Sequence, residues 1–187
     1  MTETAFRPKD GSRFVNVGLR QAALSLLDRI LSSRMPDRIR VLAIAVFRAG
    51  DRILLARGVD PVSGEAFHRP LGGGVEFGER AADALRREIA EELGAAIEEP
   101  RLLGVLENRF EYAGGPRHEI VFVFDARFSD TSLYDRSALP VIEAGTGWED
   151  ARWISLQALS DGSERITPDG LLPLLQADIR PAIPGNG

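Results

Sequence analysis

Three consecutive glycines at residues 72–74 stand shortly before a helix-forming segment at residues 80–93, and this pairing constrains the chain most. Glycines without side chains permit unusual backbone torsions and close approach of other groups. The segment 80–93 contains neither glycine nor proline, and Gly94, which tolerates a positive φ, is expected to end the helix. We therefore expect a stretch of bare backbone before a rigid helix, where a phosphate or a metal ion can approach main-chain groups.

Three glutamates share one side of this expected helix. At roughly 100° per residue, Glu88, Glu91 and Glu92 fall on the same face, three and four residues apart. Like charges at this spacing destabilise a helix unless a cation lies between them. Carboxylate oxygens favour hard cations such as Mg²⁺ or Mn²⁺, and the chain has no cysteine to favour a softer metal. The pattern predicts a divalent cation on an exposed helix face, where Glu92 contributes little packing.

Neighbouring residues are expected to hold these carboxylates in place. Arg87 lies beside the acidic face and can pair with Glu91, or with Glu79 near the start of the helix. Glu79 also lies at the positive end of the helix dipole. The apolar stripe that anchors the helix on the core consists of Ala82, Leu85, Ile89 and Leu93.

The stretch GGVEFGERAADALRREIAEELGA at residues 73–95 resembles the Nudix box. That box reads Gly, five residues, Glu, seven residues, Arg-Glu, an aliphatic residue, any residue, Glu-Glu, any residue, Gly and a bulky apolar residue. The departure is Ala95, which is small for the last position. With its flanking strands, the resemblance covers about residues 38–175. The matching positions are Gly73, Glu79, Arg87, Glu88, Ile89, Glu91, Glu92 and Gly94.

The resemblance implies an α/β/α sandwich with a mixed sheet and the metal-dependent hydrolysis of a phosphoanhydride bond in a nucleoside diphosphate linked to another group. It implies Mg²⁺ or Mn²⁺ as cofactor and Glu88, Glu91 and Glu92 as ligands, with one of them as general base in some members. In other members the base comes from a later loop, for which we consider Glu143 first, then Glu149 and Glu119. We expect the cation near Gly72, Glu88, Glu91, Glu92 and Glu143, and catalysis to involve Glu79, Arg87, Glu88, Glu91 and Glu92.

The substrate is expected to bind around the glycine turn and a later hairpin. Tyr112 follows the box by about 17 residues, where diadenosine-polyphosphate hydrolases of the family tend to carry a tyrosine, and an aromatic ring there can stack on a base. Phe67 and Phe110 are explained equally well by core packing, and His68 and His118 lack spaced partners, which favours structural roles. Isolated arginines are more often solvated than bound to ligands, Arg117 included. The substrate-binding candidates are Arg69, Gly73, Gly74, Arg109 and Tyr112.

The sequence before and after the expected helix predicts hairpins. Runs of apolar and β-branched residues predict strands, and glycine- and proline-bearing stretches between them predict turns. Such a mixture favours an α+β sandwich with a mixed sheet. The expected elements are a buried strand at 41–47 with its hairpin return at 52–57, a second hairpin of 102–110 and 119–128, a short strand at 153–155 and a last helical turn at 170–176.

Residues 19–31, LRQAALSLLDRIL, predict an extra amphipathic helix at the N-terminal end. Its stripe suits packing on the same domain or against a second copy in a homodimer. We expect residues 1–37 to be an N-terminal extension, residues 38–180 to be a single domain and residues 181–187 to be a tail.

Charge and composition exclude several classes of function. A net charge of -5 argues against a general nucleic-acid binder, which needs an excess of basic residues. The resemblance instead implies a small nucleotide-type substrate. No apolar run is long enough for a signal peptide or a membrane span, which favours a cytoplasmic protein without membrane contact. The alternative of a ligand-sensing module on the same fold is disfavoured because such modules usually lose box carboxylates. The resemblance also allows an isomerase of this fold, but such an isomerase needs a catalytic cysteine, which the chain lacks.

Overall fold

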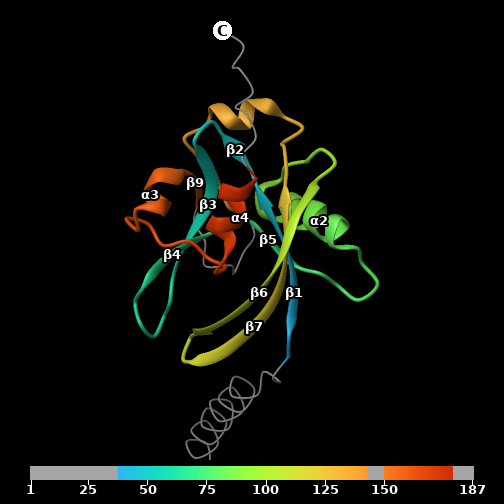
Figure 1. Ribbon diagram of the computed structural model, residues 1–187. Coiled ribbons are helices and arrows are strands. Elements are labelled where there is room, and N and C mark those ends of the chain that lie inside the picture. Colours follow the sequence, from blue (N-terminus) through green and yellow to red (C-terminus); the bar gives the residue numbers. More distant parts are fainter. Residues whose placement is uncertain (1–37, 143–149, 179–187) are drawn as a thin grey trace, which may run out of the picture. The chain divides into compact units, whose positions relative to one another are not determined.

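The computed structural model describes residues 38–142 and 150–178 (Figure 1). The chain divides into two units, Met1–Arg38 and Ile39–Gly187, and the account below concerns the second. Several sequence-based expectations lie outside the described residues. These are the helix at 19–31, the carboxylates Glu143 and Glu149, and the tail at 181–187.

One sheet carries the glycine turn and the long hairpin. Its central strand β1 runs parallel to β7, whereas the β1–β5 and β7–β6 pairs are antiparallel. This is the mixed sheet that the sequence predicts. In spatial order its strands are β5 (Gly72–Gly74), β1 (Arg40–Val46), β7 (Gly115–Asp125) and β6 (Arg101–Tyr112).

A second, antiparallel sheet contains the strand that follows β1 along the chain. The expected hairpin between 41–47 and 52–57 is therefore wrong. The chain changes sheets at Phe47, whose carbonyl accepts a hydrogen bond from Leu54, and only the short β2 pairs with β3 across the turn at Gly50. The strands are β2 (Arg48–Ala49), β3 (Arg52–Val59), β9 (Asp150–Ser155) and β8 (Ala138–Pro140), with β4 (Ala66–Arg69) paired to β3.

Helices cover the sheets on both sides, which confirms the predicted α/β/α sandwich (Figure 1). Alternate residues of β1 face two different cores. Ala43 and Ala45 belong to the core that includes α2 (Ala81–Leu93), while Leu42 and Ile44 belong to the core that includes α4 (Leu171–Ala177). The short helix α3 (Leu156–Ser160) lies with α4, and a 3₁₀ helix, η1 (Thr131–Asp135), precedes β8.

Some boundaries differ from the sequence pattern. β4 and β5 are strands that the sequence pattern does not predict, and in β5 the glycines have no side-chain alternation to reveal a strand. β7 ends at Asp125 rather than at residue 128, and β8, α3 and η1 were not expected. The turn of the long hairpin comprises Ala113 and Gly114, both with positive φ, at 54° and 75°.

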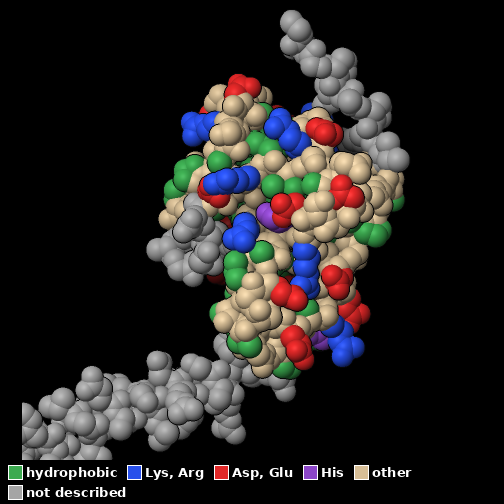
Figure 2. All heavy atoms as spheres, turned by 90° about the vertical axis from the view of Figure 1, so that its left-hand side faces the viewer, with side chains coloured by type: hydrophobic (Ala, Val, Ile, Leu, Met, Phe, Trp, Pro, Cys, Tyr) green, Lys and Arg blue, Asp and Glu red, His purple; other side chains and the backbone are tan. Residues whose placement is uncertain are grey.

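Within the described ranges, no helix is long and apolar enough to cross a membrane. On the face shown in Figure 2, basic and acidic side chains are interspersed, and neither sign gathers into one large patch.

Candidate active site

The glycine turn brings bare backbone against the acidic helix. Gly72 has φ +124°, a conformation that residues with a side chain rarely adopt, and a Cβ there would overlap the carbonyl oxygen of Ala43. The Gly72 N–H donates to Glu92 Oε2 over 2.8 Å. At Gly73, a Cβ would overlap the carboxylate of Glu88. The Glu88 carboxylate therefore approaches β5 only because Gly73 has no side chain, and the Glu92 carboxylate approaches β5 through the Gly72 N–H.

Arg87 joins the other carboxylates of this region. Its Nε and Nη2 each donate to Glu79 over 3.1 Å, and Nη2 also donates to the Gly74 carbonyl over 2.9 Å. Its Nη1 donates to Glu88 over 2.9 Å and to Glu91 over 3.2 Å. The sequence offered Glu79 or Glu91 as the partner of Arg87, and the guanidinium contacts both.

These contacts shift two pKa values in opposite directions. The hydrogen bond from Arg87 lowers the pKa of Glu79, and the Glu76 N–H, 3.1 Å from the Glu79 carboxylate, lowers it further. The same hydrogen bond to Glu79, followed by the one to Glu88, raises the pKa of Arg87. Glu79 and Arg87 are thus a fixed ion pair that orients the glutamates next to it.

The three box glutamates differ in exposure, which corrects one expectation. Glu92 is only 5% exposed, whereas the sequence placed it on an exposed face. The cause is its hydrogen bond to Gly72, which turns this side chain inward between α2 and β5. The side chain of Glu88 is 13% exposed and that of Glu91 is 49% exposed. The acidic face therefore runs from the interior to solvent along one turn of α2.

The chemistry of these donors suits a hard divalent cation. All three side chains supply carboxylate oxygens, and the bare main chain of β5 lies directly beside two of them, Glu88 and Glu92. In the part of the chain that the structure describes, no three acidic or histidine side chains are grouped closely enough to hold a metal ion together. Arg87 supplies the positive charge at Glu88 and Glu91 in this arrangement.

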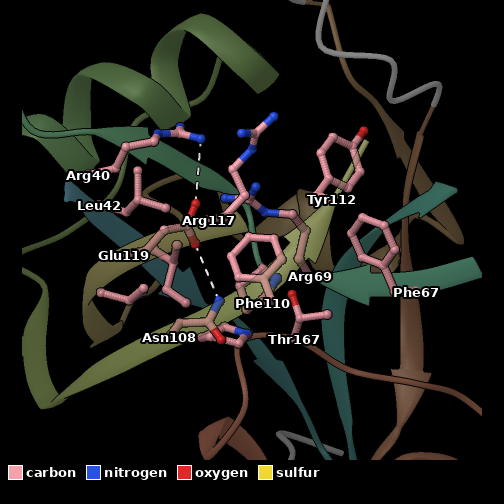
Figure 3. Close-up of a pocket in the computed structure, with 14 residues that line it drawn as sticks. Arg40, Leu42, Phe67, Arg69, Asn108, Phe110, Tyr112, Arg117, Glu119 and Thr167 are labelled. Atoms are coloured by element: carbon pink, nitrogen blue, oxygen red, sulfur yellow. Dashed lines mark hydrogen bonds and ion pairs between the residues drawn. The ribbon is translucent and has the colours of Figure 1, made fainter. Parts of the chain in front are cut away.

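A pocket of about 220 Å³ lies on the face of β1 that carries Leu42 and Ile44 (Figure 3). Strand register places Arg40, Glu119 and Asn108 side by side across β1, β7 and β6. Arg40 Nη1 lies 3.5 Å from Glu119 Oε1, and Asn108 Nδ2 donates to Glu119 Oε2 over 3.3 Å. Glu119 is thus a buried carboxylate, 5% exposed, at the base of a pocket.

Aromatic rings form part of the pocket lining. Phe67 and Tyr112 meet edge to face with ring centroids 6.2 Å apart, and Phe110 lies near them (Figure 3). For Phe67 and Phe110 the sequence left stacking and core packing open, and both side chains are partly exposed and line this pocket. Tyr112, the aromatic residue selected from the sequence, lines it too.

Arg69 and Arg117 also line the pocket, and both are partly buried. Burial lowers the pKa of Arg69, while the nearby charges of Glu119 and Glu92 raise it. Arg69 therefore lies within electrostatic reach of both the base of the pocket and the α2 carboxylates. That position suits a group that contacts phosphate between the two.

A second pocket of about 440 Å³ adjoins the first and shares Phe67, Asn108, Phe110, Tyr112 and Thr167 with it. Arg109 lines only this second pocket.

The two histidines lie outside both pockets. His118 Nε2 lies 2.9 Å from Glu107 Oε1, on the strand face opposite to Glu119. His68 is buried, its Nδ1 lies 3.3 Å from Glu164 Oε2, and burial lowers its pKa. Their surroundings agree with the structural interpretation.

The sequence did not indicate Arg40 or Asn108 as site residues, and it suggested Glu119 only as a candidate general base in catalysis. One signal was available. Asn108, Phe110 and Tyr112 alternate along one strand, as Arg117 and Glu119 do along its partner, so each set shares a face. The register that joins the two faces is not a local property.

Comparisons with known proteins agree with this geometry. A family model described as NUDIX domain matches residues 36–175. The structure is similar to the crystal structure of a MutT NUDIX hydrolase from Burkholderia pseudomallei, with 30% identity over 75% of this chain and 98% of that chain and a TM-score of 0.56. It is also similar to the solution structure of the E. coli ORF135 protein, with 25% identity over 78% and 96% of the two chains and a TM-score of 0.52. A MutT protein from Methanosarcina mazei Go1, 19% identical over 77% and 95% of the two chains with a TM-score of 0.54, shares the fold.

Proposed function

Because the chain belongs to the Nudix family and is a pyrophosphohydrolase of that family, we propose that it uses Mg²⁺ or Mn²⁺ to hydrolyse a nucleoside diphosphate linked to another group. Nudix hydrolases generally use such divalent metals and act on small nucleotide-type substrates. One observation carries the proposal: the complete set of box carboxylates lies against the glycine strand, within electrostatic reach of an arginine-bearing pocket.

The residues of α2 and β5 would hold the cation. Glu88, Glu91 and Glu92 supply its carboxylate ligands, and Gly72 supplies main-chain atoms beside them. When bound, the cation neutralises phosphate oxygens that otherwise repel an attacking water. Arg87 and Glu79 keep the carboxylates oriented, and Arg69 contacts the diphosphate from the pocket side.

The reaction replaces one P–O bond with another. Water attacks phosphorus in line, the bridging P–O bond breaks and the departing phosphate keeps the bridging oxygen. A carboxylate must take a proton from that water. Glu143 is our first candidate and Glu149 the next, with an α2 glutamate as the alternative. Glu119 is disfavoured because Arg40 and Asn108 engage its two oxygens in the pocket.

The substrate's organic part would bind in the adjoining pocket. Tyr112, Phe67 and Phe110 supply aromatic surface on which a base can stack. Arg109, at the second pocket, and the main chain of Gly73 and Gly74 complete the substrate-binding set.

Phosphate release from a substrate panel tests the proposal. The panel contains nucleoside triphosphates, nucleotide sugars, ADP-ribose and dinucleoside polyphosphates, each assayed with Mg²⁺, with Mn²⁺ and with chelator. We expect turnover of at least one class and its loss in chelator, because the carboxylates alone cannot neutralise the phosphates. Binding of a panel member without turnover in any metal would instead favour the ligand-sensing module.

Replacing Gly73 with alanine tests the contact between β5 and Glu88. The new methyl group would overlap the Glu88 carboxylate, which is the movable end of a side chain, so the domain should fold while that carboxylate shifts. Misplacement of a catalytic group by about 1 Å can cost roughly 10²-fold in rate, so we expect kcat to fall by about that factor. Steady-state kinetics at saturating Mg²⁺ measure the loss, and thermal unfolding checks the fold. Wild-type kcat in a folded variant would contradict a role for this Glu88 position.

A further inference from the structure

The bottom of the first pocket carries a buried hydrogen-bond acceptor, the Glu119 carboxylate, to which the proposed reaction gives no catalytic role. Glu119 is 5% exposed, and the two groups that hold it, Arg40 and Asn108, come from the strands on either side. Asn108 is itself 4% exposed, and its Oδ1 accepts the Asp169 N–H over 3.4 Å. The carboxylate is therefore fixed in direction from both sides.

We infer that Glu119 selects the base of the substrate, and that this pocket accepts bases whose edge donates N–H groups, guanine ahead of the others. The inference rests on the proposed function in one respect, since it takes the pocket's occupant to be the nucleoside of the hydrolysed molecule.

Hydrogen-bonding capacity carries the argument. An ionised carboxylate only accepts, and it has about four lone-pair sites; Asn108 donates to Oε2, and Arg40 forms an ion pair with Oε1. Each oxygen can accept one more N–H. Guanine offers two adjacent donors, the ring N1–H and the exocyclic amino group, which suits both oxygens at once. Adenine and cytosine offer an amino group alone, and uracil flanks its one N–H with carbonyl oxygens that a carboxylate repels.

The rest of the lining complements the acceptor atoms of guanine. Arg69 and Arg117 line the pocket with Glu119, and arginine donors pair well with the O6 and N7 acceptors of guanine. Phe110, Tyr112 and Phe67 supply aromatic surface for stacking, which favours every base alike. Discrimination among bases therefore falls to Glu119 and the arginines, not to the aromatic residues.

The position of Arg69 links this pocket to the proposed phosphate site. Arg69 lines the pocket together with Glu119, and the charges of both Glu119 and Glu92 raise its pKa. The inference takes one molecule to place its nucleobase against Glu119 and its diphosphate at the box.

Equilibrium binding of nucleoside monophosphates tests the selection without requiring turnover. Calorimetric titration of the full chain in chelator compares GMP, AMP, CMP and UMP. A good base-edge pair is worth roughly ten-fold to a hundred-fold in discrimination, so we expect wild-type Kd for GMP to be at least about ten-fold lower than for UMP. In Glu119→Gln, one acceptor oxygen becomes a donor, and the GMP preference should fall to within about two-fold.

Two further variants separate selection from general damage. Glu107→Gln alters a glutamate on the same hairpin whose side chain is 61% exposed and does not line the pocket, so the wild-type ranking should persist. Tyr112→Ala should weaken all four ligands by a similar factor, because stacking does not read the base edge. If Glu119→Gln fails to fold, the order of the four Kd values of the wild-type protein still tests the inference.

The outcomes are distinct from those of the hydrolysis assay. Equal affinity for the four ligands, no measurable binding of any, or an undiminished GMP preference in folded Glu119→Gln would each overturn the inference. Hydrolysis with no base preference would leave the proposed function intact and reject only this selection. A nucleobase preference with no hydrolysis of any panel member would support the selection by Glu119 and reject the proposed function.

Discussion

We expect Glu92→Gln to lower kcat by about 10³-fold while the domain remains folded. The substitution removes the charge of one proposed cation ligand, and loss of several kcal/mol of charge stabilisation in the transition state corresponds to a factor of this size. The fold should survive because glutamine has nearly the same shape and keeps one side-chain oxygen to accept the Gly72 N–H, 2.8 Å away. The test compares kcat across a Mg²⁺ titration, with thermal unfolding measured in parallel.

The burial of Glu92 makes a matched control necessary. Glu107→Gln is the same change at an exposed residue outside both pockets, and its kcat should stay within about two-fold of wild type. Unchanged turnover in folded Glu92→Gln would remove Glu92 from the cation site. Loss of folding would instead show that the Glu92 charge on the Gly72 N–H is needed mainly for stability, and Glu88→Gln would then carry the test of metal binding.

Local sequence patterns predicted the helix of this site well. The start of α2, its end at Gly94 with φ +63° and the pairing of Arg87 with Glu79 and Glu91 all depend on residues within one or two helical turns or on the adjoining turn. Helical periodicity shows which side chains share a face. It does not show which way that face turns, and for this reason Glu92 was expected to be exposed.

Contacts between distant segments were beyond the sequence. The change of sheet at Phe47 depends on β1 finding partners in β5 and β7, which are about 30 and 80 residues further along the chain. The row of Arg40, Glu119 and Asn108 depends on the register of three strands. Such rows follow from tertiary pairing, so the base of the pocket could be recognised only in the folded chain.

The three glycines of β5 should differ sharply in their tolerance of a methyl group, with Gly72 the most sensitive. Alanine at Gly72 must adopt φ +124°, and its Cβ would overlap the Ala43 carbonyl and lie 2.9 Å from Ile44 Cα. Both obstacles are backbone of the central strand β1, which cannot move aside as the end of a side chain can. Backbone strain and overpacking each cost about 1–3 kcal/mol, so we expect Gly72→Ala to lower the free energy of unfolding by roughly 3–5 kcal/mol.

Gly74→Ala is the matched control for this stability measurement, because a Cβ at Gly74 has no atom within 4 Å among the described residues and no positive φ opposes it. Chemical denaturation should place Gly74→Ala within about 1 kcal/mol of wild type, since relief from glycine's unfolded-state entropy is of that size. Similar losses in both variants would mean that β5 needs glycine for a reason other than its contact with β1. A stable Gly72→Ala would show that β5 can move away from β1, and Glu92, bound to the Gly72 N–H, would then have to move with it.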